Sequence, residues 1–169
     1  MGMTPEEFFE SFVMGNYEDC QQNKGCVRRA FNAAVSASHM ADHYFTFYKK
    51  FDSSKVNSFK TIGDFVEYLS NNTCACFQDI RSISNVYKHL YESNDPKKAV
   101  HSSISSTGAI EYISFDDNNA EVQKIEEKWA EGYKFNINSK VVFTRKDGQR
   151  IDFLLTLDSV IKFWEKLLS

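Results

Sequence analysis

Between Gly25 and Phe51 the chain contains neither proline nor glycine, and its apolar residues recur at the spacing of a helix. At about 100° per residue, one face of this segment collects small and aromatic side chains. These are Phe31, Ala34, Ala37, Ser38, Ala41, Phe45 and Tyr48. The small residues near the middle allow a second helix to approach closely. The segment therefore predicts a long central helix against which other helices pack.

The first 95 residues predict three further helices. Thr4-Pro5-Glu6-Glu7 is a strong helix start, because threonine caps, proline suits the first helical position and carboxylates favour the positive end of the helix dipole. Apolar periodicity and breaks place the four helices at residues 4–20, 26–51, 58–71 and 75–91. Four antiparallel helices with short connections are the simplest way to bury their apolar stripes.

After Pro96 the pattern changes to short alternating segments. Residues 109–115 predict a strand, residues 120–132 a short helix, and residues 133–157 two strands around Asp147-Gly148. Asp158 is expected to cap a final helix over residues 159–168. The predicted class is α+β, mainly α: a four-helix bundle followed by a small antiparallel sheet and a C-terminal helix. We expect one domain over residues 1–169, with the bundle in 1–95 and the sheet with its closing helix in 109–169.

The composition makes several classes of function less favoured. The net charge of −3 lacks the basic excess of nonspecific nucleic-acid binders, so an RNA partner would need a local basic patch. No apolar run approaches the ~20 residues of a membrane span, and the N-terminus is acidic and amphipathic, unlike a signal peptide. We therefore expect a cytoplasmic protein with no membrane partner. The spacing of Cys20, Cys26, Cys74 and Cys76 does not match zinc sites, which favours reduced thiols, and no cofactor is expected.

Two histidines suggest a metal site on the central helix. His39 and His43 lie four residues apart on one helical face, with Asp42 near its edge, as in helical zinc sites. A third ligand would have to come from another segment, for instance His89 or Asp79. The alternative is a partly exposed polar face whose imidazoles bond to neighbouring side chains.

The fourth predicted helix carries a file of polar residues opposite its apolar face. Its members are Arg81, Asn85, Lys88 and His89. A row of polar residues like this one has three alternative roles: a surface exposed to solvent, a polar contact with another helix, or a catalytic surface. In a catalytic surface, arginine stabilises a phosphate that gains charge, and histidine transfers a proton near neutral pH. The segment Arg145–Arg150 adds a charged hairpin tip that could touch phosphate or only improve solubility.

The segments NAAVSASH (residues 32–39) and RSISNVYKH (residues 81–89) together resemble a family. They match bacterial helical proteins with an NAA-x-x-A-x-H helix and an R-x-I-x-N-x-x-K-H helix, a pattern similar to the HEPN superfamily. The resemblance covers about residues 25–92. It implies a helical bundle that dimerises, and in many members a metal-independent ribonuclease whose arginine and histidine lie near the end of a helix at the dimer interface.

Carried over to this chain, the resemblance makes Arg81 and His89 the candidate catalytic pair, with Asn85 and Lys88 in support. Seven residues separate Arg81 from His89, one more than the family usually has. This spacing and the acidic net charge rank a dimeric interaction module without catalysis first. A HEPN-type endoribonuclease using Arg81 and His89 is the second hypothesis, and a metal-dependent enzyme using His39 and His43 is the third. A homodimer is the expected assembly, and RNA is the candidate substrate of the second hypothesis.

Overall fold

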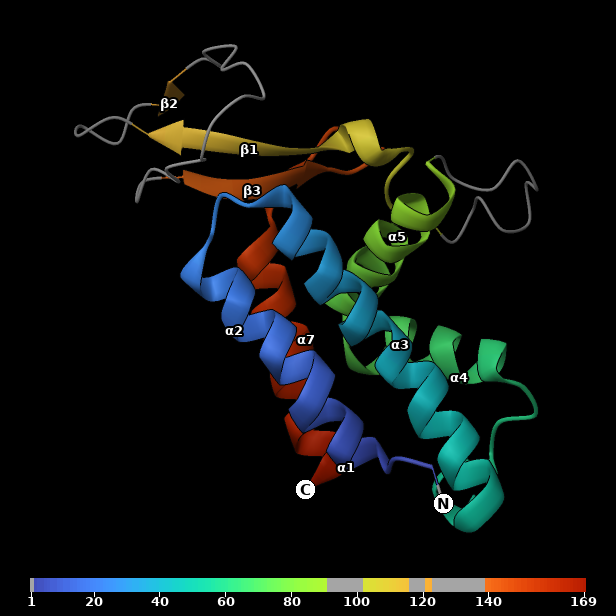
Figure 1. Ribbon diagram of the computed structural model, residues 1–169. Coiled ribbons are helices and arrows are strands. Elements are labelled where there is room, and N and C mark those ends of the chain that lie inside the picture. Colours follow the sequence, from blue (N-terminus) through green and yellow to red (C-terminus); the bar gives the residue numbers. More distant parts are fainter. Residues whose placement is uncertain (1, 91–101, 116–120, 123–138) are drawn as a thin grey trace.

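The computed structural model describes residues 2–90, 102–115, 121–122 and 139–169. These residues form a helical bundle, a small antiparallel sheet and a C-terminal helix (Figure 1). The predicted class, α+β and mainly α, is confirmed.

The N-terminal helix is one continuous rod with a wider turn in its middle. It consists of α1 (Pro5–Phe8), the π-helical turn η1 (Phe9–Met14) and α2 (Gly15–Gln22). Its start is a capping box: the Glu7 amide donates to Thr4 Oγ1 at 3.1 Å, and the Thr4 amide donates to Glu7 Oε2 at 2.8 Å. The predicted start is thus confirmed, and the helix ends two residues beyond the predicted Cys20.

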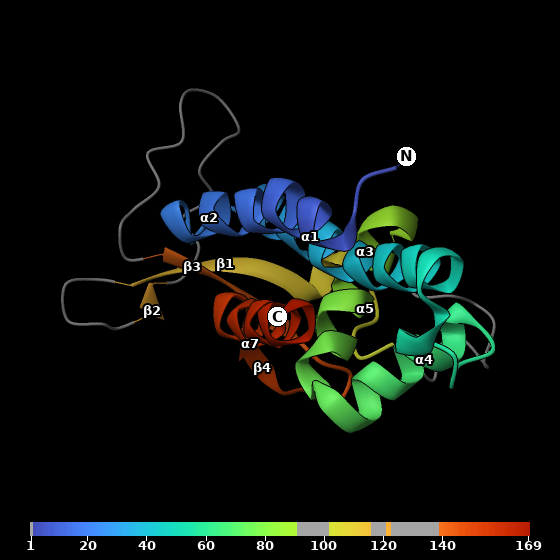
Figure 2. The ribbon, with the colours of Figure 1, turned by 90° about the horizontal axis from the view of Figure 1, so that it is seen from below.

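The central helix α3 runs from Val27 to Phe51, in agreement with the prediction. All seven residues of its predicted apolar face are buried. The helix lies between the N-terminal helix and α5 (Ala75–His89), and it also contacts α4 (Ile62–Tyr68) and α7 (Phe153–Leu168) (Figures 1 and 2). Alanines at its middle allow these close approaches.

The third helix differs from its prediction at both ends. A short 3₁₀ turn, η2 (Ser53–Lys55), follows α3, and α4 begins only after Thr61. Thr61 and Asp64 form a second capping box, a local signal that outweighs the serine at position 58. At its far end the chain continues through the π-helical segment η3 (Leu69–Thr73), so Asn71-Asn72 does not break the helix there.

The described strands form a sheet in the order β2-β1-β3-β4, with every neighbouring pair antiparallel. The bounds are β1 (Ile110–Phe115), β2 (Glu121–Val122), β3 (Ser139–Thr144) and β4 (Arg150–Asp152), and a 3₁₀ turn, η4 (Thr107–Ala109), precedes β1. The predicted helix over 120–132 is wrong at residues 121–122, whose backbone pairs with β1; its remainder lies outside the described residues. The sheet lies across one end of the bundle (Figure 1).

The last helix starts earlier than predicted. Asp152, not Asp158, is its cap: Oδ1 of Asp152 accepts hydrogen bonds from the amides of Leu154 and Leu155 at 3.0 and 3.2 Å. The apolar run at residues 153–157, predicted as the end of a strand, is the first turn of α7. A short apolar run fits a buried strand or a buried helix equally well, so periodicity did not separate the two. Asp158 instead accepts a hydrogen bond from the Tyr17 hydroxyl at 2.7 Å.

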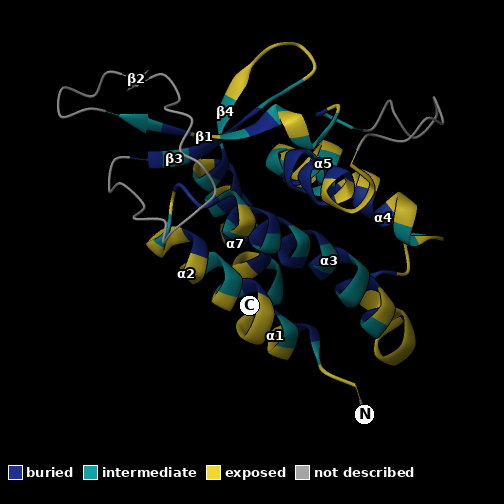
Figure 3. Ribbon diagram, turned by 45° about the horizontal axis from the view of Figure 1, so that its top comes forward, coloured by how far each residue is buried: buried dark blue, intermediate teal, exposed yellow. Residues whose placement is uncertain are grey.

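An ion pair with a buried carboxylate and a partly exposed arginine joins the β3–β4 hairpin to α5. Arg145 Nε and Nη2 donate to the two carboxylate oxygens of Asp79 at 3.1 and 2.5 Å. The Asp79 side chain is only 3% exposed. The charged hairpin tip therefore contributes one of its arginines to the packing of α5, while exposed residues gather at the turn itself (Figure 3). Among the described residues, no helix combines the length and the apolar character that crossing a membrane would require.

Candidate functional site

The polar face of α3 lines a groove between the N-terminal helix and α5. We call it the aromatic groove, and its volume is about 620 Å³. Its lining residues come from η1, α2, α3 and α5, together with Phe8 of α1. They are Phe8, Phe12, Asn16, Asn32, Val35, Ser36, His39, Asp42, His43, Thr46 and Tyr87. The volume lies within the range of about 300–1,000 Å³ that is typical of small-molecule sites.

Four ionisable side chains from two helices meet beside this groove. The Lys88 ammonium group contacts Nε2 of His39, and Nη1 of Arg81 lies 3.8 Å from Oδ2 of Asp42. We call these four residues the α3–α5 cluster. The polar face of α3 and part of the polar file of α5 therefore meet at this point.

The packing of the two helices explains the convergence. The later residue of α5 contacts the earlier residue of α3, so the helices run antiparallel. His39 and Asp42 are three residues apart and lie on the same side of α3, with Cβ atoms about 5–6 Å apart. Arg81 and Lys88 are seven residues apart, about 10 Å along their own helix axis. Their long side chains thus bring two positive charges to neighbouring points on α3.

The imidazole of His39 is the electrostatic centre of the cluster. Burial lowers the pKa of His39 below its usual 6.5, and the positive charge of Lys88 lowers it further, while Asp42 acts in the opposite direction. The imidazole is therefore neutral at pH 7. An ammonium group can only donate, so in this contact Nε2 accepts from Lys88 and the proton of the neutral ring lies on Nδ1.

Aromatic side chains form the walls of the groove. Phe12, in the π-helical turn η1, is 47% exposed, and Tyr87 on the opposite wall is 46% exposed. Tyr87 stacks on Phe31 with ring centroids 4.7 Å apart, so a buried ring supports it from behind. π-Helical turns recur at functional sites, and this one carries the exposed ring of Phe12 into the groove.

The four residues proposed from the family resemblance are not all brought together. Arg81 and Lys88 belong to the cluster, whereas Asn85 and His89 are exposed on α5. His89 is eight residues beyond Arg81, about 12 Å along the helix axis, in the last turn. Arg81 points toward Asp42 of α3. Among the described residues, the imidazole that contacts Lys88 is that of His39, which the sequence predicted either as a metal ligand or as part of a polar face that bonds to neighbouring side chains.

The predicted metal ligands point to different partners. His43 Nε2 donates to the Met3 carbonyl at 2.8 Å, and its ring stacks on Phe8 at 4.7 Å between centroids. His39 Nε2 faces the Lys88 ammonium group. Asp79, named as a third ligand, is held by Arg145. In the part of the chain that the structure describes, no three His, Cys, Asp or Glu side chains are grouped as a metal site would require.

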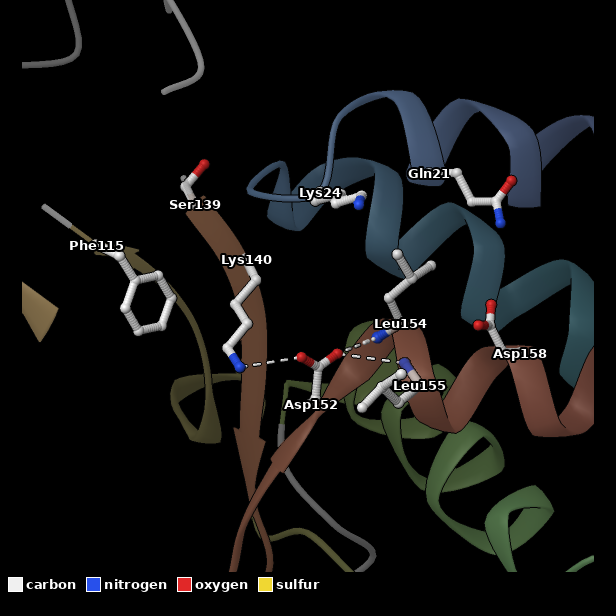
Figure 4. Close-up of a pocket in the computed structure, with 9 residues that line it drawn as sticks. All are labelled: Gln21, Lys24, Phe115, Ser139, Lys140, Asp152, Leu154, Leu155 and Asp158. Carbon is white, nitrogen blue, oxygen red and sulfur yellow. Dashed lines mark hydrogen bonds and ion pairs between the residues drawn. The ribbon is translucent and has the colours of Figure 1, made fainter. Parts of the chain in front are cut away.

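A second hollow, of about 660 Å³, lies between the end of α2, the sheet and the start of α7 (Figure 4). Its acidic groups already have partners: Lys140 Nζ lies 3.1 Å from Asp152 Oδ2, and Asp158 accepts from Tyr17. Burial, followed by the hydrogen bond to Asp158, raises the pKa of Tyr17 to about 12. These contacts hold the start of α7 against β3 and α2, which makes this hollow the weaker candidate.

Comparisons of the chain with protein-family models, with curated proteins and with solved structures found no match. The resemblance to the HEPN superfamily therefore remains a prediction from the two sequence segments. The candidate site rests on the geometry of the α3–α5 cluster and the aromatic groove.

Proposed function

We propose that this chain is a dimeric interaction module without catalysis, and that the aromatic groove and its two flanks dock a second copy of the chain. The observation that carries the proposal is the opposite charge of the two flanks. The groove separates an acidic helix from a helix whose surface charges are basic.

The acidic flank is the N-terminal helix. Residues 4–22 contain five acidic residues and neither lysine nor arginine. Glu7, Glu10 and Glu18 are exposed. The basic flank is α5, where Lys88 is exposed and Arg81 partly exposed, while the acidic residue of this helix, Asp79, is buried against Arg145. In a two-fold dimer the same patch meets itself in reverse, so each acidic flank would face the basic flank of the other copy.

The exposed rings supply the apolar part of such a contact. Phe12 and Tyr87 stand on opposite walls of the groove, and both expose nearly half of their surface. Aromatic residues and arginine are the side chains that most often carry binding energy at interfaces. In the dimer, Phe12 of each copy would pack near the groove of the other, surrounded by the complementary charges.

A charge-swap experiment tests the proposal. The first variant combines Arg81→Glu and Lys88→Glu, and the second combines Glu10→Lys and Glu18→Lys. Sedimentation equilibrium should show a dimer for the unaltered chain and monomers for each variant alone, because like charges then face each other. An equimolar mixture of the two variants should form a heterodimer. The control pair is Lys162→Glu with Lys166→Glu, at exposed positions on α7, which should leave the dimer intact.

A monomeric unaltered chain at every concentration tested would refute the proposal. If both charge-swap variants still dimerise as the control variant does, the dimer interface does not lie on this face. Circular dichroism of each variant separates loss of association from loss of folding, since all of the substituted side chains except Arg81 are exposed.

A metal-independent endoribonuclease is the second candidate function. The observation in its favour is the contact of the His39 imidazole with Lys88, on the same turn of α3 as the Asp42–Arg81 pair, because an imidazole suits proton transfer and cations stabilise a charged phosphorane. In the family-based version, Arg81 and His89 form the catalytic pair, with Asn85 and Lys88 in support.

RNA cleavage assays with His89→Ala and His39→Ala separate the two versions. Loss of cleavage in the His89 variant alone supports the family-based pair, and loss in the His39 variant alone supports the α3–α5 cluster. Cleavage by both variants at the rate of the unaltered chain would exclude both histidines from catalysis.

A further inference from the structure

The two cations of the α3–α5 cluster end close together although they are far apart on their own helix. Lys88 ends at His39 and Arg81 ends at Asp42, and these two residues of α3 are neighbours on one helical face. The Cβ atoms of residues three apart on a helix are about 5–6 Å from each other, so the two cations contact a single turn of α3. The positions of the head groups are thus set by α3.

Neither cation is well compensated by its contact. Lys88 contacts a neutral imidazole, so this contact removes none of its positive charge. Arg81 has one long ion pair, 3.8 Å from Nη1 to Asp42 Oδ2, and a guanidinium group presents five N–H donors. Two positive charges and one negative charge meet at the rim of a groove, on a chain whose net charge is −3.

We propose that Lys88 and Arg81 together bind a tetrahedral oxyanion of the phosphate class at the rim of the aromatic groove. One oxygen would accept from the Lys88 ammonium group and one or two from the Arg81 guanidinium group, which suits bidentate contact with phosphate. Asn85 lies between these residues in the sequence and is exposed on α5, so its amide would be a further donor.

Two neighbouring groups weaken the binding of an anion, and substitution of one of them provides a second test. The Asp42 carboxylate repels it and competes for Arg81, and the last carbonyls of α5 carry partial negative charge near Lys88. Removal of the Asp42 charge should then strengthen binding, whereas a merely structural role of the ion pair would make the same substitution harmful.

Binding of the oxyanion does not require dimerisation, because both cations belong to one chain. Its consequence for assembly rests on the proposed function: phosphate at Lys88 and Arg81 would occupy the place of the acidic flank of the second copy, and would weaken the dimer.

The experiment is a titration of the ¹⁵N-labelled full chain with sodium phosphate at constant ionic strength, followed by NMR. Saturable shifts should appear for residues of α5 and α3 around the cluster. Lys88→Ala and Arg81→Ala should each weaken phosphate binding about tenfold, the usual effect of losing a hydrogen bond to a charged group. Asp42→Asn should tighten it, and Lys162→Ala, an exposed lysine on α7, should leave it unchanged.

Sulfate that binds at the same residues supports the oxyanion class. The proposal is overturned if phosphate causes no saturable shift, if Asp42→Asn weakens binding as Lys88→Ala does, or if Lys162→Ala weakens it equally. Binding of a single-stranded RNA oligonucleotide without binding of phosphate also overturns it, because the surface would then need a polyanion. Sedimentation with and without phosphate tests the dimer separately: unaltered association alongside saturable phosphate binding refutes only the competition.

Discussion

The ion pair of Asp79 and Arg145 should be the most sensitive charged contact in the described part of the chain. The hydrogen bonds to Asp79 raise the pKa of Arg145, which strengthens its positive charge at the carboxylate. Breaking a fully buried pair by removing one partner costs about 3–5 kcal/mol, because the remaining charge is stranded. Arg145 is 31% exposed and Asp79 3% exposed, so water can enter the space left by the arginine. We expect Arg145→Ala to cost about 2–3 kcal/mol of unfolding free energy.

Urea unfolding followed by far-ultraviolet circular dichroism measures this loss. The double variant Asp79→Leu with Arg145→Met should be more stable than Arg145→Ala, because it strands no charge. The matched control is Arg150→Ala in the same hairpin. Arg150 Nη2 lies 3.0 Å from Glu111 Oε1, but the two side chains are 39% and 32% exposed, so the expected loss is below about 1 kcal/mol. Equal losses for Arg145→Ala and Arg150→Ala would contradict the role of burial in this argument.

Two further predictions concern the site and its support. The pKa of His39 is lower in the folded chain than its usual 6.5. Its contribution to stability is therefore present above pH 6.5 and is lost as the pH falls through the pKa of the folded chain. In His39→Gln, the urea midpoint should depend less on pH below 6.5 than in the unaltered chain. A Cβ at Gly25 would clash with Oγ and Cβ of Ser139, beside the hydrogen bond from the Val141 amide to the Lys24 carbonyl. Gly25→Ala should therefore cost about 1–3 kcal/mol of unfolding free energy, and adding Ser139→Gly should recover part of the loss in melting temperature. If Ser139→Gly recovers none of the loss, the clash with Ser139 is not the reason why Gly25→Ala destabilises the chain.

The helices of the first half of the chain could be predicted because their local signals agree with one another. The capping box at Thr4 and the apolar face of α3 appear both in the sequence and in the structure. The start of α4 was misplaced because Ser58 and Thr61 are both suitable caps. Only Thr61 has an acidic residue three positions later to complete the reciprocal bonds.

The C-terminal third was harder to predict because its apolar runs are short. Residues 151–158 combine an apolar run with two aspartates, either of which can cap a helix. Tertiary contacts decide between them: Asp152 lies at the end of β4 beside Lys140, and Asp158 is bonded to Tyr17 across the bundle. Neither partner is near in sequence, so no local pattern indicates the choice.

The candidate site shows the same division between local and tertiary information. Each polar file is visible on its own helical wheel, but the pairing of Lys88 with His39 and of Arg81 with Asp42 depends on how α3 and α5 align. The exposed ring of Phe12 depends on the π-helical turn, for which the sequence gives no clear signal.

Stability alone does not account for the α3–α5 cluster. The two helices already pack through residues with essentially no exposed surface, such as Ala34 and Ala41 on α3 and Ile83 on α5. At the rim, an exposed ion pair contributes about 0–1 kcal/mol, and a lysine beside an imidazole makes protonation of that imidazole less favourable. Two cations placed around a neutral imidazole therefore add little to folding, while they create positive potential at the edge of a groove. An arrangement of this kind is better explained by what it binds, whether the acidic flank of a second copy or a phosphate.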